Sequence, residues 1–129
     1  MVVLLDTHVL LWTLDAPARL PKDVVTQLES PQTTVYFSAA SIWEIAIKSS
    51  LGKVDFRYSP EDIAQAARDT GFAELSVSAA HGAKVAQLPL HHRDPFDRLL
   101  IAQTLLLPAQ LITADVALVP YSELVHLVK

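Results

Sequence analysis

The chain has 129 residues, of which 51% are hydrophobic and 19% charged, with 14 acidic residues, 10 basic residues and no cysteine. This length suits one domain, because two domains of half the size would each bury too small a core. The low charge excludes intrinsic disorder, and the absence of cysteine excludes disulfide frameworks and cysteine-ligated zinc modules. The net charge of −4 argues against simple electrostatic binding of nucleic acid.

Neither a targeting segment nor a membrane span is predicted. The apolar start of the chain reaches Asp6 too early for a secretory signal and has no basic segment before it. The apolar stretch 99–119 is interrupted by Pro108 and several polar residues, so we expect a helix followed by a buried strand there. Together with a cysteine-free composition that fits a reducing compartment, these features predict a cytoplasmic protein with no membrane partner.

The first half of the chain alternates strands with helices. Residues 2–5 are an apolar run typical of a strand buried on both faces, and residues 34–37 are β-branched and aromatic. Prolines in first turns, and glycines at positions 52 and 71 just beyond helix ends, predict helices at 8–14, 21–29, 39–51 and 60–70.

The second half continues the alternation. We expect a strand at 74–77, a helix capped by Ser78 that runs to residue 88, and a helix from Asp94 to Leu107. A strand at 111–113, a short turn at 116–119 and an edge strand at 124–128 follow. Strands that alternate with helices form parallel sheets, so residues 1–129 are predicted to be one α/β domain, a three-layer α/β/α sandwich with a central, mainly parallel sheet.

Several enzyme classes are excluded by the motifs that are missing. Three glycines cannot build the glycine-rich loops that bind dinucleotides or nucleotide phosphates. There is no GxSxG segment, no cysteine nucleophile and no HExxH among the five histidines. The candidate chemistry is therefore that of carboxylates.

Four carboxylates stand at positions where an acid is unusual. Asp6 and Asp115 follow predicted strands, at the edge of the sheet where α/β proteins bind ligands. Glu44 lies in an apolar helix, and Asp97 shares a helix face with apolar residues. Each acid also has a purely structural interpretation: Asp6 and Asp115 as caps of the segments that follow, Asp97 as an acid in a first helical turn, and Glu44 in an ion pair with Lys48. These alternatives stay open for each acid taken alone.

Taken together, the acids predict a metal site. Carboxylates brought to one sheet edge repel one another unless a hard divalent cation lies between them, and all-oxygen ligation selects Mg²⁺ or Mn²⁺ over zinc. Such a site can activate water for phosphodiester hydrolysis. Asp94 precedes Pro95 and is expected to act as a helix cap instead.

Basic residues near these acids have two interpretations. They are either solvated surface charges or a positive rim for phosphates, with Phe56 and Tyr58 nearby to stack on unpaired bases. The group comprises Lys48, Lys53, Arg57, His91, His92, Arg93 and Arg98.

Four segments, in order along the whole chain, carry a family resemblance. They are Asp6-Thr7-His8, Trp43-Glu44-Ile45-Ala46, the segment from Arg93 to Gln103 with its Asp-Pro-Phe-Asp-Arg block, and Ile112-Thr-Ala-Asp115. The chain resembles PIN domains, and among them the VapC-type toxins of bacterial toxin–antitoxin pairs. The resemblance implies a Mg²⁺-dependent endoribonuclease that is usually dimeric and is held inactive by a cognate antitoxin protein.

Matched position by position, the resemblance assigns the family's acidic quartet to Asp6, Glu44, Asp97 and Asp115, as catalytic residues and metal ligands. Thr113 matches a hydroxyl position beside the last acid, Thr7 is a second supporting residue, and we expect Lys48, Arg93 and Arg98 to contact RNA. Two departures affect packing alone: Thr104 replaces a common alanine and Pro108 a common turn glycine.

Two other functions are compatible with such a fold. A non-catalytic interaction module would not need the intact quartet, and a phosphoacceptor domain would need an aspartate after the strand at 34–37, where Ser38 stands. Four large apolar residues are predicted to lie in the core rather than at an interface with an antitoxin or a second subunit. They are Leu10, Leu11, Trp12 and Trp43.

Overall fold

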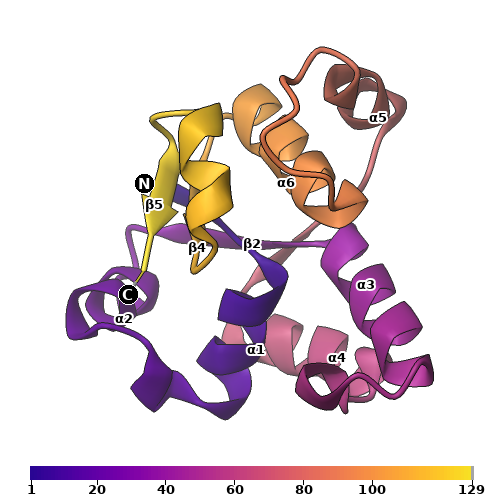
Figure 1. Cartoon of the computed structure of the whole chain (residues 1–129). Coiled ribbons are helices and arrows are strands. Elements are labelled where there is room, and N and C mark those ends of the chain that lie inside the picture. Colours follow the sequence, from indigo (N-terminus) through magenta and orange to yellow (C-terminus); the bar gives the residue numbers. More distant parts are fainter. Residues whose placement is uncertain (129) are drawn as a thin grey trace.

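A computed structural model describes residues 1–128 (Figure 1). In chain order its elements are β1 (Val2–Leu5), α1 (Thr7–Asp15), η1 (Pro17–Arg19), α2 (Lys22–Glu29), β2 (Thr34–Ser38), α3 (Ala39–Ser50), η2 (Val54–Phe56), α4 (Pro60–Thr70), β3 (Ala73–Leu75), α5 (Ala79–Val85), α6 (Pro95–Leu106), β4 (Gln110–Thr113), η3 (Val116–Tyr121) and β5 (Val125–Leu127), where η marks a 3₁₀ helix.

The five strands form one sheet in the order β3-β2-β1-β4-β5. Every pair of neighbouring strands is parallel, so the mainly parallel sheet that the sequence predicts is entirely parallel. The apolar strand β1 lies at the centre, paired with β2 on one side and β4 on the other. The carboxyl ends of these three strands, which are followed by Asp6, α3 and Asp115, therefore meet at one edge.

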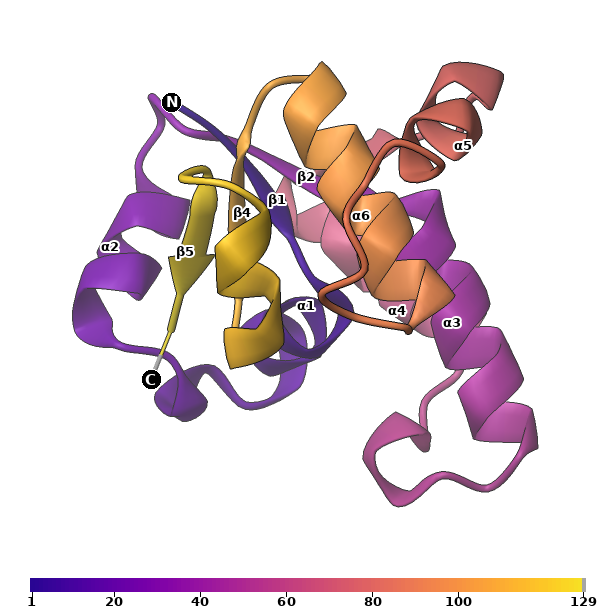
Figure 2. The same cartoon turned by 45° about the horizontal axis from the view of Figure 1, so that its top comes forward.

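Helices cover both faces of the sheet, as the predicted three-layer sandwich requires (Figures 1 and 2). Val3 and Leu5 of β1 pack in a core with residues of α1, α2 and α4. Leu4, which points to the opposite face, packs against Leu100 and Ile101 of α6. The helix α5 packs on α6 at the outside of the molecule (Figure 2). Alternation along β1 thus separates the two cores.

The predicted elements are all present, with differences at their ends. β3 begins at Ala73 and ends at Leu75, and α5 ends at Val85 rather than at residue 88. The early end of α5 has a physical reason, because the Arg98 guanidinium of α6 binds the backbone oxygens of Val85 and Pro89 at 3.1 and 3.0 Å and holds the chain in a loop. No helix within residues 1–128 is long and apolar enough to cross a bilayer.

The prediction of a buried Trp43 is wrong. Leu10 and Leu11 are buried in the core and Trp12 is half-buried, but Trp43 is 61% exposed. The buried stripe of α3 consists of Ala40, Ser41, Glu44 and Ile45, and position 43 lies off this stripe. The Trp43 ring instead contacts the edge of Phe96 on α6, with 5.2 Å between the ring centroids.

Candidate active site

Asp6 is held rigidly at the end of β1. Its Oδ1 accepts a hydrogen bond of 2.8 Å from the Val9 backbone N–H, which makes it the N-cap of α1, and its Oδ2 accepts one from the Thr113 hydroxyl. The residue is only 5% exposed. Burial raises the pKa of the Asp6 carboxyl above its usual value, and the hydrogen bonds from Thr113 and Val9 oppose that rise. The cap interpretation of Asp6 is thus confirmed, and the same carboxylate also faces the site.

Glu44 reaches the same edge from α3. It is 3% exposed, and its Oε1 accepts a hydrogen bond of 2.6 Å from the Thr7 hydroxyl. Its Oε2 lies 2.5 Å from the Lys48 ammonium one helical turn away. The predicted ion pair therefore forms, but around a buried carboxylate rather than on an exposed face. Burial lowers the pKa of Lys48, but the bond to Glu44 and the charges of Glu44, Asp94 and Asp97 outweigh it and raise the pKa above its ordinary value.

The start of α6 contributes two aspartates. Asp94 is the N-cap, as predicted, and its Oδ1 accepts hydrogen bonds from the backbone N–H groups of Phe96 and Asp97 at 2.8 and 3.2 Å. Its Oδ2 lies 3.8 Å from the Lys48 ammonium. Asp94 therefore also faces the site, beside the four acids that the sequence assigns to it.

Asp97 is the most perturbed of the acids. Burial raises the pKa of its carboxyl to about 7, and the negative charges of Asp94, Glu44 and Asp6 add to the rise, while His92 opposes it. The Asp97 carboxyl therefore keeps its proton to a higher pH than an ordinary aspartate does. A carboxyl perturbed by burial and by neighbouring acids is typical of a functional site.

Asp115 completes the acidic group at the end of β4. It is the N-cap of η3, and its Oδ1 accepts a hydrogen bond of 3.0 Å from the Ala117 backbone N–H. The buried Thr113 hydroxyl joins this acid to the first one, because it accepts a hydrogen bond of 3.0 Å from the Asp115 backbone N–H while it donates to Asp6. Thr113, predicted as a supporting residue, therefore links Asp6 and Asp115 through two hydrogen bonds.

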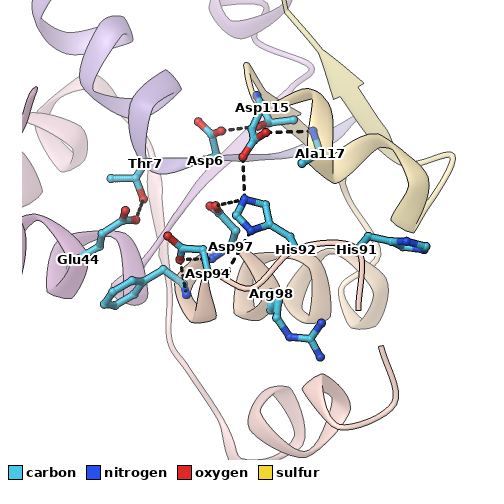
Figure 3. A network of polar contacts seen from close by, with 12 residues as sticks. Asp6, Thr7, Glu44, His91, His92, Asp94, Asp97, Arg98, Asp115 and Ala117 are labelled. Atoms are coloured by element: carbon cyan, nitrogen blue, oxygen red, sulfur yellow. Dashed lines mark hydrogen bonds and ion pairs between the residues drawn. The ribbon is translucent and has the colours of Figure 1, made fainter. Parts of the chain in front are cut away.

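His92 is a site residue that the sequence does not single out. Its Nε2 lies 2.9 Å from Asp115 Oδ2 and 3.2 Å from Asp97 Oδ2 (Figure 3). Its Nδ1 accepts a hydrogen bond of 3.0 Å from the Asp94 backbone N–H, so the proton of the neutral ring lies on Nε2, facing the two carboxylates. The sequence offers one clue, since a side chain two residues before a helix cap can bond to the backbone of that cap.

The loop that carries His92 is fixed by Tyr121. The Tyr121 hydroxyl accepts hydrogen bonds from the backbone N–H groups of His91 and His92 at 3.0 and 2.8 Å. His91 packs edge-on against the Tyr121 ring and points away from the acids, in contrast to its neighbour (Figure 3). The orientation of the His92 ring is therefore set by two contacts: Tyr121 holds its backbone, and the Asp94 N–H holds its Nδ1.

These side chains line one pocket of about 240 Å³, which we call the acidic pocket. It is lined by Asp6, Thr7, His8, Glu44, Lys48, His92, Asp94, Asp97 and Asp115. Ligand atoms of His92, Asp97 and Asp115 lie within 4.8 Å of one another, close enough to share a metal ion. The carboxylate oxygens that dominate this lining fit a hard divalent cation.

The three predicted RNA contacts are placed differently. Lys48 lines the acidic pocket and Arg93 is exposed on the loop before Asp94. Arg98 points away from the acids and binds backbone oxygens of the 85–89 loop together with the Tyr121 hydroxyl (Figure 3). Its contacts assign it to stabilising the loop that carries His92, so the geometry does not support the predicted RNA contact at Arg98.

Two fully buried threonines allow a matched test of the hydrogen bonds around Asp6. We expect Thr113→Val to lower the free energy of unfolding by about 1–3 kcal/mol, because it leaves Asp6 Oδ2 and the Asp115 N–H without their partner. Thr104→Val is the control, because the Thr104 hydroxyl has no hydrogen-bond partner in residues 1–128. Urea unfolding in a chelator measures both, and an equal loss in the two variants would contradict this role of Thr113.

Comparisons with known proteins identify the family and the fold of the chain. The chain belongs to the PIN domain family, whose model matches residues 3–122. Its fold is similar to a chain in the crystal structure of VapBC2 from Rickettsia felis bound to a DNA fragment from their promoter, with a TM-score of 0.74, 14% sequence identity and 100% of both chains covered. The comparison with curated proteins gave no match. PIN domains are generally nucleases that use divalent metals, which fits the acidic pocket.

Proposed function

We propose that this protein is a Mg²⁺- or Mn²⁺-dependent endoribonuclease, the VapC-type toxin of a bacterial toxin–antitoxin pair, acting in the cytoplasm. The observation that carries the proposal is the convergence of Asp6, Glu44, Asp97 and Asp115, from four different elements, on one pocket in a PIN-family chain. Burying so many acids together is costly unless a cation compensates them. A bound Mg²⁺ or Mn²⁺ would supply an activated water and would neutralise charge on the phosphodiester.

The residues divide this work by their geometry. Asp97 and Asp115 share His92 and would be metal ligands together with Asp6, whose carboxylate Thr113 orients. Glu44, held by Thr7 and Lys48, would complete the acidic pocket. The Lys48 ammonium would meet a phosphate oxygen of the substrate at the rim.

A purified preparation incubated with mixed RNA oligomers tests the proposal. With Mn²⁺ or Mg²⁺ we expect internal cleavage that leaves 5′-phosphate and 3′-hydroxyl ends, and no cleavage in a chelator. RNA that stays intact with either metal would overturn the enzyme assignment and favour the alternative, a non-catalytic interaction module on the same fold.

The proposal includes an antitoxin partner and a second copy of the chain. Its support is the family together with three exposed apolar side chains: Trp43 of α3, Leu51 at the end of α3 and Leu90 of the loop before α6 are 61%, 67% and 70% exposed. An antitoxin or a second copy that covered these side chains would remove their apolar surface from water. Light scattering of the isolated chain distinguishes a dimer from a monomer.

His92→Ala is expected to weaken Mn²⁺ binding about 10- to 100-fold, the usual loss when a group that orients metal ligands is removed. The reason is the hydrogen bond that Nε2 donates to Asp115 and its contact with Asp97. Calorimetric titration with Mn²⁺ measures the effect. His91→Ala is the matched control, because that ring points away from the acids (Figure 3). Equal Mn²⁺ affinity in the parent and in His92→Ala would contradict the role.

A further inference from the structure

A second and larger cavity adjoins the acidic pocket. It has a volume of about 640 Å³, within the range of ligand sites, and lies between α1 and the segment from η2 to the start of α4. Asp6 and His8 line both cavities, so the two meet at these residues. We call it the α1 groove and define it by the side chains that line its length, His8, Trp12, Asp15, Arg19, Arg57 and Tyr58.

Two guanidinium groups in the α1 groove are available to a ligand. Arg19 comes from η1, after α1, and Arg57 follows η2, and both residues are exposed. Within residues 1–128, neither has a carboxylate oxygen within salt-bridge distance or donates a hydrogen bond to another side chain. In contrast, Arg68 binds Glu74 at 3.3 Å and Arg98 binds backbone oxygens. Guanidinium groups that have no carboxylate partner and lie beside a hydrolytic site are suited to phosphate oxygens.

The rest of the α1 groove suits the sugar and base of a nucleotide. His8, Trp12 and Tyr58 supply aromatic rings, and the Arg19 guanidinium lies over one face of the Trp12 ring, 4.3 Å from its centroid. Besides Asp6, two carboxylates line the groove: Asp55, and Asp15, whose Oδ2 accepts a hydrogen bond of 2.7 Å from the Tyr58 hydroxyl. A carboxylate can accept the 2′-hydroxyl of a ribose, which DNA lacks. The carboxylates would therefore favour RNA over DNA, whereas arginines alone would bind the phosphates of either.

We propose that the α1 groove binds the unpaired ribonucleotides that flank the scissile phosphate, with Arg19 and Arg57 on the backbone phosphates and the aromatic rings on the bases. This inference rests on the proposed ribonuclease function and adds the path of the strand. The RNA leaves the acidic pocket past His8 and runs along α1 toward Arg57. The path requires unpaired bases, because only these can stack on the aromatic rings.

Binding of a 12-nucleotide single-stranded RNA, measured by fluorescence anisotropy in the Asp97→Asn background to prevent cleavage, tests the path. We expect Arg57→Gln and Arg19→Gln each to weaken binding about tenfold and to reduce the slope of log affinity against log salt by about 0.7. Arg68→Gln removes the same charge outside the groove and is expected to leave binding unchanged. DNA of the same sequence should bind more weakly than RNA, and unfolding curves confirm that each variant is folded.

The outcomes separate this inference from the proposed function. If the parent chain cleaves RNA but Arg57→Gln and Arg19→Gln bind it as the Asp97→Asn protein does, the α1 groove is not the RNA path and the nuclease assignment stands. An equal loss in Arg68→Gln would show a non-specific charge effect and would also overturn the inference. Absence of any cleavage by the parent would contradict the proposed function itself.

Discussion

Replacing Asp97 by asparagine is expected to reduce RNA cleavage more than about 100-fold, beyond the usual loss from removing a residue that only orients metal ligands. The substitution keeps the size of the side chain but removes the charge that faces His92 and the other acids. Cleavage of a labelled RNA with saturating Mn²⁺ measures the effect, and circular dichroism confirms the fold. Full activity in this variant would overturn the assignment of Asp97.

Asp69→Asn provides the matched control for that experiment. Asp69 lies on the exposed side of α4 and accepts a hydrogen bond from Gln65. It does not line the acidic pocket. The substitution removes the same charge without touching a pocket residue, so cleavage should equal that of the parent. A comparable loss in both variants would mean that net charge, rather than the pocket, governs activity.

The second large effect is the pH dependence of stability in the absence of metal. Because the pKa of Asp97 rises from 3.8 to about 7 on folding, the folded chain binds a proton more tightly than the unfolded chain. The free energy of unfolding should therefore fall as pH rises from about 4 to about 7 and then level off. The loss due to Asp97 is up to about 4 kcal/mol, since each tenfold change in proton affinity is worth about 1.4 kcal/mol.

Urea unfolding in a chelator between pH 5 and pH 8 measures this slope. The excess stability of Asp97→Asn over the parent should be larger at pH 8 than at pH 5, because the amide carries no charge at either pH whereas folding opposes ionisation of the parent carboxyl. Asp97 shares the acidic pocket with other titratable groups, which include Asp6, Glu44, Lys48, His92, Asp94 and Asp115. Added Mn²⁺ should restore the stability of the parent at pH 8 and change that of the variant much less. The same slope in both proteins would contradict the pKa assignment.

The layered fold could be predicted because each strand is short, the central strand β1 is apolar, and most strands are followed by residues that begin a helix. β1 and the helix after it need only the run Val2–Leu5 followed by Asp6. Boundaries set by tertiary contacts could not be predicted. The end of α5 depends on Arg98, which is distant in sequence and reaches back to the Val85 carbonyl.

The sequence predicted the acids of the site better than their surroundings. Strand ends place Asp6 and Asp115 at one sheet edge by topology alone, whereas His92 reaches the site only because Tyr121 and Asp94 bind its loop. Trp43 shows the converse error. Its size favours burial, but the stripe of α3 that faces the protein is set by Glu44 and Ile45.

The capping role of three pocket acids has an electrostatic consequence. Asp6, Asp94 and Asp115 cap α1, α6 and η3, so the amino ends of three helical segments converge on the acidic pocket. Aligned peptide dipoles place up to about half a positive elementary charge at the amino end of a regular α-helix. Fixed backbone amides thus offset part of the carboxylate charge before any cation binds. The pocket can therefore keep its shape without metal, and an approaching phosphate meets a weaker negative potential than the count of acids alone suggests.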